Sequence, residues 1–431
     1  MPGSRARSKA DAGLTRPPSR REAGRSQPDR ALDALQIRNI NSKMQWMFDR
    51  LAGPQLASLA ERFPAVALLG ARQVGKTTLA RSAFPGAGYV DLEDQLTAQR
   101  FADDARSALE ASAPRAVILD EAQAVPAIFP ALRGAIDAER GRNGRFVVLG
   151  SAQPSLVRAI AESLAGRIAV VELDPLAACE AATGASPRSW HELWLKGGFP
   201  DALRAGHRDW WEAYLRMLLE RDLPQYGVAA DPIFLRRLLT MLAHQHGGVF
   251  NASTLGSSLG VSYHTVQRYV EALESVFLVR RLRPWFRNVG KRLVKAPKVY
   301  VRDSGLLHHL LNIGSHDALL SHPSRGASWE GFVIEDVLRR ERIARPASQA
   351  WYWRTAAGAE IDLLLDRGGS RVAIEVKTAR PGAHALRVLR NALPDAGAAR
   401  GWIVDHARGV ERLDSNIARA GFDDLRYGTP E

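Results

Sequence analysis

Short apolar runs alternate with amphipathic stretches between residues 65 and 175, and this alternation predicts an α/β unit built on a parallel sheet. The predicted strands cover residues 66–69, 89–92, 116–119, 145–149 and 168–173. Apolar residues recur at helical spacing in segments 76–83, 126–139 and 155–165, which we expect to form helices between these strands.

The pattern changes three times along the remaining chain. Residues 176–246 are expected to be helical, with aromatic and leucine side chains as packing residues: Trp190, Leu193, Trp194, Trp210, Trp211, Tyr214 and Leu215. Residues 247–313 are predicted to form a winged-helix module, and residues 314–431 return to a mixed α/β pattern. Together with a unit over 44–175 and a tail over 1–43, this gives the expected domain order.

Composition adds limits to this picture. With 431 residues, two or three domains are expected. No apolar run is long enough to cross a bilayer, and no apolar leader marks a secretory signal, so we expect no membrane role. A single cysteine, Cys179, excludes an intramolecular disulfide and a cysteine zinc cluster, which is consistent with a cytoplasmic protein.

The formal net charge of +13 favours contact with a polyanion. Part of this charge lies in residues 1–43, where Arg, Ser, Pro and Ala dominate and disorder is expected. Two interpretations stay open: the tail binds nucleic acid loosely, or translation starts at Met44 or Met47 and the tail is not made.

A phosphate-binding loop is the strongest motif in the chain. It follows the strand at 66–69 and leads directly into a helix, so that glycines and successive backbone N–H groups can surround phosphates. Lys76 is expected to reach the β- and γ-phosphates of ATP, and the Thr77 hydroxyl to ligate Mg²⁺. The expected nucleotide-binding residues are Gly70, Ala71, Arg72, Gln73, Val74, Gly75, Lys76, Thr77 and Thr78.

Two acids end the strand at 116–119. Asp120 is expected to hold Mg²⁺, and Glu121 to orient the attacking water. After the next strand, Ser151 and Gln153 are candidates for sensing the γ-phosphate. Arg167 is a candidate arginine finger in cis or in trans, or an ordinary surface arginine before a strand.

Residues 255–273 have helix–turn–helix form. Gly260 can end the first helix and Ser262 can cap the second. Helical spacing then buries Val266, Val270 and Leu273 and leaves an exposed face suited to a groove or to phosphates: Tyr263, His264, Gln267 and Arg268. A basic wing is expected downstream at Arg287, Lys291, Arg292 and Lys295.

A second pattern of acids lies in residues 330–377. Asp362 and Glu375 fall on predicted strands and could bind Mg²⁺, while Lys377 shares a face with Glu375 and could steady a nucleophilic water. Glu330 and Glu335 lie on the preceding amphipathic helix. This order is similar to the restriction-endonuclease-like fold, and the alternative is a scaffold that binds a nucleic acid or a partner without cutting.

Several of these motifs together resemble the AAA-type ATPases of bacteria and archaea that carry a C-terminal domain of unknown function. The segments that carry the resemblance are 70–78, 89–93, 118–123, 164–167, 196–200, 220–222, 295–300, 302–305 and 353–355. The resemblance implies an ATPase fold, with ATP and Mg²⁺ at Lys76, Thr77, Asp120 and Glu121. Segment 150–153 departs from the Ser-Ser pair common in that family, so the sensor assignment does not carry over.

Three functions follow from this pattern. The first is an ATPase that couples nucleotide state to DNA binding through its C-terminal modules. The second is an ATP-gated, metal-dependent DNA nuclease, and the third is a nucleotide switch that binds protein partners or further copies of itself. Salt-dependent DNA binding separates the first two from the third, because phosphate contacts release counterions.

Overall fold

The structure is a computed structural model that describes residues 48–112, 116–151, 154–183, 187–204, 206–225, 228, 230–286 and 294–425. The expected tail at 1–43, Gln153 and three residues of the basic wing (Arg287, Lys291 and Arg292) lie outside the described residues. Segment Phe48–Glu431 forms one compact unit. Within the described ranges, none of the helices combines the length and apolar character that crossing a bilayer requires.

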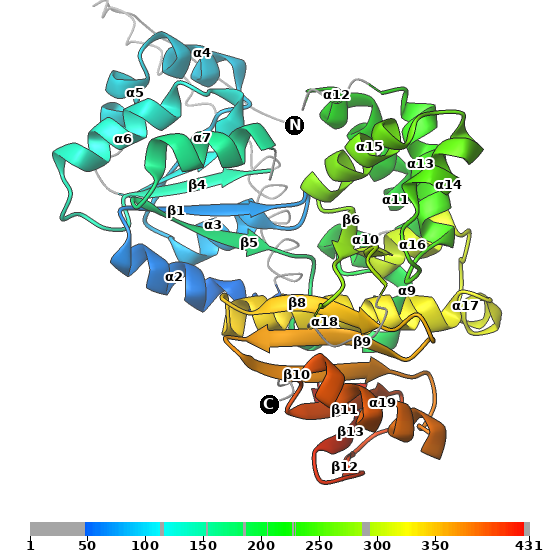
Figure 1. The fold of residues 1–431 in the computed structure, drawn as a ribbon. Helices are drawn as coiled ribbons and strands as arrows, with labels where there is room; N and C mark the ends of the chain where they lie inside the picture. Colours follow the sequence, from blue (N-terminus) through cyan, green and yellow to red (C-terminus); the bar gives the residue numbers. More distant parts are fainter. Residues whose placement is uncertain are drawn as a thin grey trace, which may run out of the picture. The chain divides into compact units, whose positions relative to one another are not determined.

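The first sheet contains five parallel strands in the order β2-β3-β4-β1-β5 (Figure 1). The strands are β1 (Ala65–Gly70), β2 (Gly88–Asp91), β3 (Val117–Asp120), β4 (Phe146–Gly150) and β5 (Ile168–Leu173). All five strands expected from the apolar pattern are present, with ends shifted by at most one residue. Because the strands are parallel, their C-terminal ends share one edge of the sheet.

Helices cover both faces of this sheet, so its central strands are buried on both sides. One face packs against α2 (Ala52–Arg62) and α3 (Lys76–Ala83) through Val66 and Leu68. The other face packs through Ala67 and Leu69 against helices drawn above the sheet in Figure 1. These helices are α5 (Ala105–Ser112), α6 (Ile128–Ala138) and α7 (Pro154–Leu164). In the chain, α4 (Gln95–Asp103) precedes α5, and the short η1 (Ala122–Ala124) precedes α6.

Helices follow the first sheet as expected. They are α8 (Ala178–Ala182), α9 (Trp190–Lys196), α10 (Pro200–Arg204), α11 (His207–Met217), α12 (Leu223–Gln225) and α13 (Pro232–His244). A turn of π-helix, η2 (Leu218–Asp222), interrupts the run after α11. The expected packing residues are buried, apart from the half-buried Trp210.

The helix–turn–helix segment forms α14 (Ala252–Leu259) and α15 (Tyr263–Ser275), followed by the antiparallel strands β6 (Val279–Leu282) and β7 (Lys298–Val301). Gly260 ends α14 in the left-handed conformation, and the Ser262 side chain accepts a hydrogen bond from Thr265 N. Both capping predictions are therefore confirmed. The buried and exposed faces of α15 are also as predicted, with Gln267 half-buried.

The C-terminal region contains a mixed six-stranded sheet in the order β12-β13-β11-β10-β9-β8. Its strands are β8 (Gln349–Arg354), β9 (Glu360–Arg367), β10 (Ser370–Val376), β11 (Arg400–Asp405), β12 (Val410–Arg412) and β13 (Ile417–Gly421). The helices of this region are α16 (Ser304–Leu310), α17 (His316–Ser321), α18 (Arg325–Ala344), α19 (Ala383–Ala396) and α20 (Phe422–Leu425). Residues of α18 belong to the core on one face of the sheet, and α19 packs on the other.

Candidate functional site

The predicted phosphate loop lies between β1 and α3, at the edge where the parallel strands end. Gly75 adopts a φ of 98°, a conformation that favours glycine, immediately before α3 begins at Lys76. A Cβ atom at Gly70 would collide with the backbone oxygen of Leu173 on β5. Both glycines are therefore required by the local backbone, as expected for a loop that brings its N–H groups close to phosphates.

Lys76 is buried inside this loop. Its Nζ donates hydrogen bonds to the backbone oxygens of Gly70 at 3.2 Å and Ala71 at 3.0 Å. Burial lowers the pKa of Lys76 from its ordinary value, while nearby Glu121 and Asp120 oppose this effect. The ammonium is thus held at the loop by weak backbone acceptors, which a phosphate group can replace with stronger charge-assisted bonds.

Thr77 and Asp120 meet across the edge of the sheet. The Thr77 hydroxyl donates to Asp120 Oδ2 at 2.7 Å, and the Tyr89 hydroxyl donates to the same oxygen at 2.9 Å. A hydroxyl and a carboxylate are the hard oxygen ligands that Mg²⁺ prefers, with water and phosphate oxygens completing its shell. The donor set at this edge therefore fits the magnesium ion that the sequence predicted.

Glu121 follows Asp120 with a φ of 50°, which is uncommon for a residue other than glycine. Its Oε2 accepts a hydrogen bond from the Gln123 side chain. Ser151 directly follows the end of β4, between β3 and β1 in the sheet, and its hydroxyl has no partner among the described residues. Both side chains thus belong to the loop's edge of the sheet, where the sequence analysis expected them.

Arg72 connects the phosphate loop to the helical region. Its guanidinium contacts Asp222 Oδ1 at 3.0 Å and Glu93 Oε1 at 3.0 Å. Asp222 is fully buried on the π-helical turn η2, and burial raises its pKa although Arg72 opposes the rise. A π-helical turn is often found at a functional site. The contact gives η2 a direct connection to the loop.

Arg167 does not lie near the phosphate loop. Its backbone oxygen accepts from Ala65 N at the start of β1, whereas the loop follows the end of that strand. Its guanidinium is paired with Asp137, with Arg167 Nε 2.9 Å from Asp137 Oδ1. The prediction of an arginine finger in cis is therefore wrong, because the arginine and the loop are at opposite edges of the sheet. A role in trans stays a prediction.

The second predicted site is brought together in part. Glu330, Asp362, Glu375 and Lys377 line one pocket of about 420 Å³. Lys377 Nζ lies 2.5 Å from Glu375 Oε1, and Asp362 Oδ2 accepts from Val376 N at 2.9 Å. The convergence of α18, β9 and β10 on one pocket agrees with the predicted arrangement.

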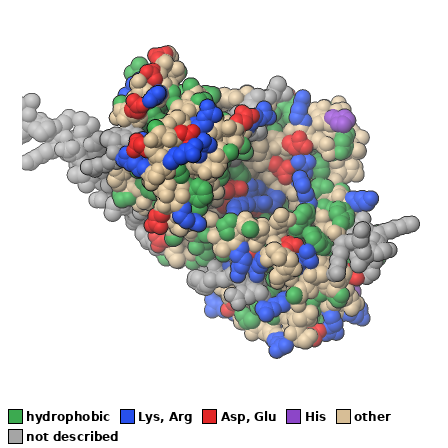
Figure 2. All heavy atoms as spheres, turned by 60° about the vertical axis from the view of Figure 1, so that its left-hand side comes forward, with side chains coloured by type: hydrophobic (Ala, Val, Ile, Leu, Met, Phe, Trp, Pro, Cys, Tyr) green, Lys and Arg blue, Asp and Glu red, His purple; other side chains and the backbone are tan. Residues whose placement is uncertain are grey.

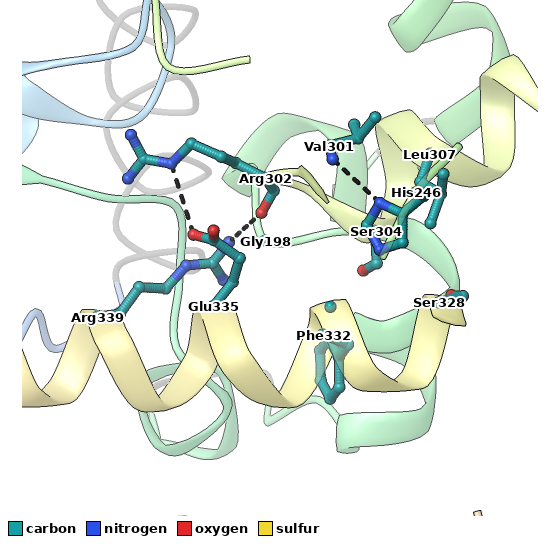
Figure 3. Close-up of a pocket in the computed structure, with 11 residues that line it drawn as sticks. Gly198, His246, Val301, Arg302, Ser304, Leu307, Ser328, Phe332, Glu335 and Arg339 are labelled. Carbon is teal, nitrogen blue, oxygen red and sulfur yellow. Dashed lines mark hydrogen bonds and ion pairs between the residues drawn. The ribbon is translucent and has the colours of Figure 1, made fainter. Parts of the chain in front are cut away.

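Glu335 is not part of this pocket. Figure 3 shows it extending from α18 toward Arg302, and Arg280 also binds its carboxylate. It lies about 1.4 helical turns beyond Glu330 on α18, so the two side chains face different directions. The assignment of Glu335 to a second metal site is therefore wrong: its charge is neutralised by arginines beside a cavity of about 10 Å³.

Lys298 and Glu360 also line the pocket, and the position of Lys298 was not predicted from the sequence. Lys298 begins β7, and neither its distance along the chain nor its local pattern indicated contact with acids on α18 and β9. Two further contacts were missed at the nucleotide site, namely those of Tyr89 and Asp222. Both residues lie in segments that carried the family resemblance, which was the only signal for them.

Residues 62–182 match the family model described as an AAA domain. Residues 187–317 and 325–420 match two further models, each described as a domain of unknown function (DUF8612 and DUF4143). The match at 62–182 shows an AAA-type ATPase domain, and it includes the phosphate loop, Asp120 and Glu121.

Two curated relatives are similar over most of their length. The uncharacterized protein Rv2008c of Mycobacterium tuberculosis is 41% identical over 364 residues, covering 82% of this chain and 79% of the relative. The uncharacterized protein Mb2031c of Mycobacterium bovis gives the same figures. Among solved structures, the Walker-type ATPase PABY2304 of Pyrococcus abyssi shares 14% identity, with 62% of this chain and 96% of that chain covered and a TM-score of 0.43.

Proposed function

We propose that this protein, which belongs to the same family as Rv2008c and Mb2031c and carries an AAA-type ATPase domain, binds ATP with Mg²⁺ and hydrolyses it. The single observation that carries the proposal is the 2.7 Å contact between Thr77 Oγ1 and Asp120 Oδ2, beside the buried Lys76. These side chains come from two neighbouring parts of one sheet edge, and they supply a magnesium site and a phosphate-binding cation together.

The roles of the side chains follow from their chemistry. Lys76 exchanges its backbone acceptors for phosphate oxygens, and the N–H groups before α3 bind the same phosphates. When bound, Mg²⁺ neutralises charge on the phosphates. Glu121 accepts a proton from the attacking water and orients it, after its carboxylate has left Gln123.

Two substitutions test this assignment in the full chain. Lys76→Ala is expected to abolish nucleotide binding, whereas Glu121→Gln is expected to retain binding and lose about 10²–10⁴-fold in ATP turnover. Arg106→Ala is the control, because the Arg106 side chain on α5 is highly exposed. Wild-type protein that neither binds Mg²⁺-ATP nor turns it over would contradict the proposal, as would full turnover by Glu121→Gln.

The proposal extends to DNA as the polyanion that the ATPase acts with. In its support, the side chains of Tyr263, His264 and Arg268 on α15 are exposed. On the face drawn in Figure 2, Lys and Arg side chains are interspersed with Asp and Glu. DNA binding would therefore depend on a small number of contacts such as those of α15.

A metal-dependent nuclease is not part of this proposal. Such chemistry requires a divalent cation between Asp362 and Glu375. The ammonium of Lys298 lies 3.5 Å from Asp362 Oδ1 and competes with such a cation for this oxygen. A nucleotide switch for protein partners, or an assembly of several copies, remains the alternative from a different class.

Binding of duplex DNA that weakens steeply with salt supports the DNA proposal, and binding that is absent at low salt contradicts it.

A further inference from the structure

The C-terminal pocket is lined by ammonium groups as well as by carboxylates. We call it the acid pocket and define it by four carboxylates and two ammonium groups: Glu330, Glu360, Asp362, Glu375, Lys298 and Lys377. The carboxylates come from α18, β9 and β10, whereas Lys298 comes from β7, the second strand of a separate two-stranded sheet. A cation from another element is therefore built into the pocket.

Lys298 is 2% exposed and is surrounded by carboxylates. Its Nζ lies 2.8 Å from Glu330 Oε1 and 3.5 Å from Asp362 Oδ1, and it also forms an ion pair with Glu360. Although burial opposes its charged form, Tyr300 and the surrounding acids raise the pKa of Lys298 above its ordinary value. The ammonium is thus charged and shared by three carboxylates.

Asp362 and Glu375 differ in how their two oxygens are engaged. Asp362 Oδ2 accepts from Val376 N, so that only Oδ1 of this residue faces Lys298. Glu375 Oε1 contacts Lys377, while Glu375 Oε2 is buried and has no hydrogen-bond partner among the described residues. Burial, together with the charge of Asp362, raises the pKa of Glu375 to about 8 and that of Glu330 to about 7.

A divalent cation does not fit beside this ammonium. Mg²⁺ requires an octahedral shell of carboxylate and water oxygens at about 2.0–2.1 Å. Lys298 already pairs with three of the four carboxylates that could supply such oxygens. Across the residues that the structure describes, no three His, Cys, Asp or Glu side chains are arranged to hold a metal ion. The pocket already contains the ammonium groups of Lys298 and Lys377, and both would repel a divalent cation placed among the same acids.

We propose that Lys298 is the resident cation of the acid pocket, and that the pocket takes up a divalent metal only when this ammonium is removed. Lys298 is then a specificity-determining residue: it sets the pocket's preference for an ammonium over a metal ion. The carboxylates keep a ligand set of hard oxygens, including the free Oε2 of Glu375, which becomes usable once the central charge is absent.

The test measures Mn²⁺ binding to the full chain without nucleotide, by electron paramagnetic resonance of free Mn²⁺. Lys298→Met is expected to raise the affinity for Mn²⁺ by at least about tenfold over wild type. Mn²⁺ is also expected to raise the unfolding temperature of this variant but not that of wild type. Lys295→Met is the matched control, because Lys295 is exposed and lies three residues before Lys298. It should bind Mn²⁺ as wild type does.

Removal of Lys298 leaves the carboxylates around it without a positive partner, which could unfold the protein. A second variant therefore reduces this uncompensated negative charge. Lys298→Met combined with Glu360→Gln removes one negative charge and keeps Glu330, Asp362 and Glu375 as ligands. The proposal is overturned if a folded variant gains no Mn²⁺ affinity. It is also overturned if wild type binds Mn²⁺ in a manner that Asp362→Asn abolishes. Neither result bears on ATP hydrolysis, which depends on Lys76 and Glu121.

Discussion

Tyr89 binds the same carboxylate oxygen of Asp120 that Thr77 binds, and it reaches that oxygen from the neighbouring strand β2. The guanidinium carbon of Arg81 lies 3.8 Å above the centre of the Tyr89 ring and holds it in place. Because two donors fix the position of Asp120, its second oxygen is turned toward the backbone N–H of Glu121. Tyr89 is therefore a positioning residue for the proposed magnesium site.

Tyr89→Phe tests this role. The lost hydrogen bond contributes about 1 kcal/mol, which corresponds to about a fivefold change in an equilibrium constant. We expect the Mg²⁺ concentration at half-maximal ATPase rate to rise by about this factor, with a smaller change in the rate at saturating Mg²⁺. Tyr263→Phe on α15 is the control. An unchanged Mg²⁺ requirement in Tyr89→Phe would rule out the positioning role.

His308 gives the fold a dependence on pH. Its ring nitrogens contact Leu195 O at 2.9 Å and Ser328 Oγ at 2.7 Å, and burial lowers its pKa to about 4. The unfolded chain therefore takes up this proton first, near its ordinary pKa of about 6.5. The stability that neutral His308 contributes is fully present above that pH and is lost as the pH falls toward 4.

We expect the free energy of unfolding to fall by roughly 3 kcal/mol from this residue over that range. Chemical denaturation between pH 7 and pH 4 should show a smaller loss for His308→Gln than for wild type. His246 and His406 also have lowered pKa values, so the variant should keep part of the dependence. His264→Gln, at an exposed position, should behave as wild type. Equal slopes in wild type and His308→Gln would contradict the assignment.

At the scale of single elements, strands and helix caps could be predicted closely from the sequence. The strand at 168–173 has the predicted ends. Gly260 ends α14 through its left-handed backbone conformation, and Ser262 begins α15 through its capping hydroxyl, both as predicted. Local chemistry decides these features, because a cap or an apolar strand depends on neighbours in the sequence. The amphipathic helix that was predicted to carry Glu330 and Glu335 covers Arg325–Ala344 in the structure, and many of its side chains are buried.

The positions that could not be predicted depend on contacts between distant elements. Lys298 meets acids from three other elements, and Arg167 is separated from the loop by the length of β1. The spacing of residues in the sequence does not predict at which edge of a sheet a loop residue lies. The residues of the phosphate loop were predictable because strand, loop and helix are continuous in the chain.

The element with the clearest predicted role in DNA binding is α15. Arg268 on its exposed face is expected to contact a phosphate, so Arg268→Ala should weaken DNA binding uniformly across sequences. It should also reduce the slope of log affinity against log salt by about 1. Fluorescence anisotropy with labelled duplexes over a salt series measures both effects. Arg106→Ala on α5, where the arginine is highly exposed, should leave both unchanged. A loss equal in both variants would argue against a specific role of α15.

At the scale of the whole molecule, the end of β5 is tied to the C-terminal region by buried ion pairs. Arg302 Nη2 lies 2.6 Å from Asp174 Oδ1 and 3.0 Å from Glu172 Oε1, and Arg342 contacts the same two acids. Burial opposes the charge of Asp174, but Arg342 and Arg302 lower its pKa to about 2. Removing one partner of such a cluster leaves a buried charge uncompensated. We therefore expect the first sheet and the C-terminal region to unfold together, in one cooperative transition.

Mg²⁺-ADP should therefore stabilise parts of the chain that it does not contact. Apart from Trp46, all tryptophans lie at position 190 or beyond. At a nucleotide concentration of about 100 times Kd, stabilisation by about 2.7 kcal/mol is expected. We expect the unfolding temperature followed by tryptophan fluorescence to rise by several degrees, in one transition. Lys76→Ala should remove this shift. Two transitions, with the tryptophan signal unmoved by nucleotide, would show that the two regions unfold independently.

Helix α18 has a consequence for how such a chain can change by recombination. Its Asp336 accepts a hydrogen bond from Ala178 N, its Arg339 donates to Leu176 O, and its Trp329 donates to Lys377 O. One helix thus satisfies backbone groups at residues 176–178, directly after the first sheet, and at Lys377 in the C-terminal sheet region. An exchange of the segment after residue 325 between relatives would keep the bond from Trp329 to Lys377 O, but it would break the bonds to Ala178 and Leu176 unless the incoming segment also carried the aspartate and arginine at positions 336 and 339. The segments that match separate family models are therefore expected to be inherited together during evolution.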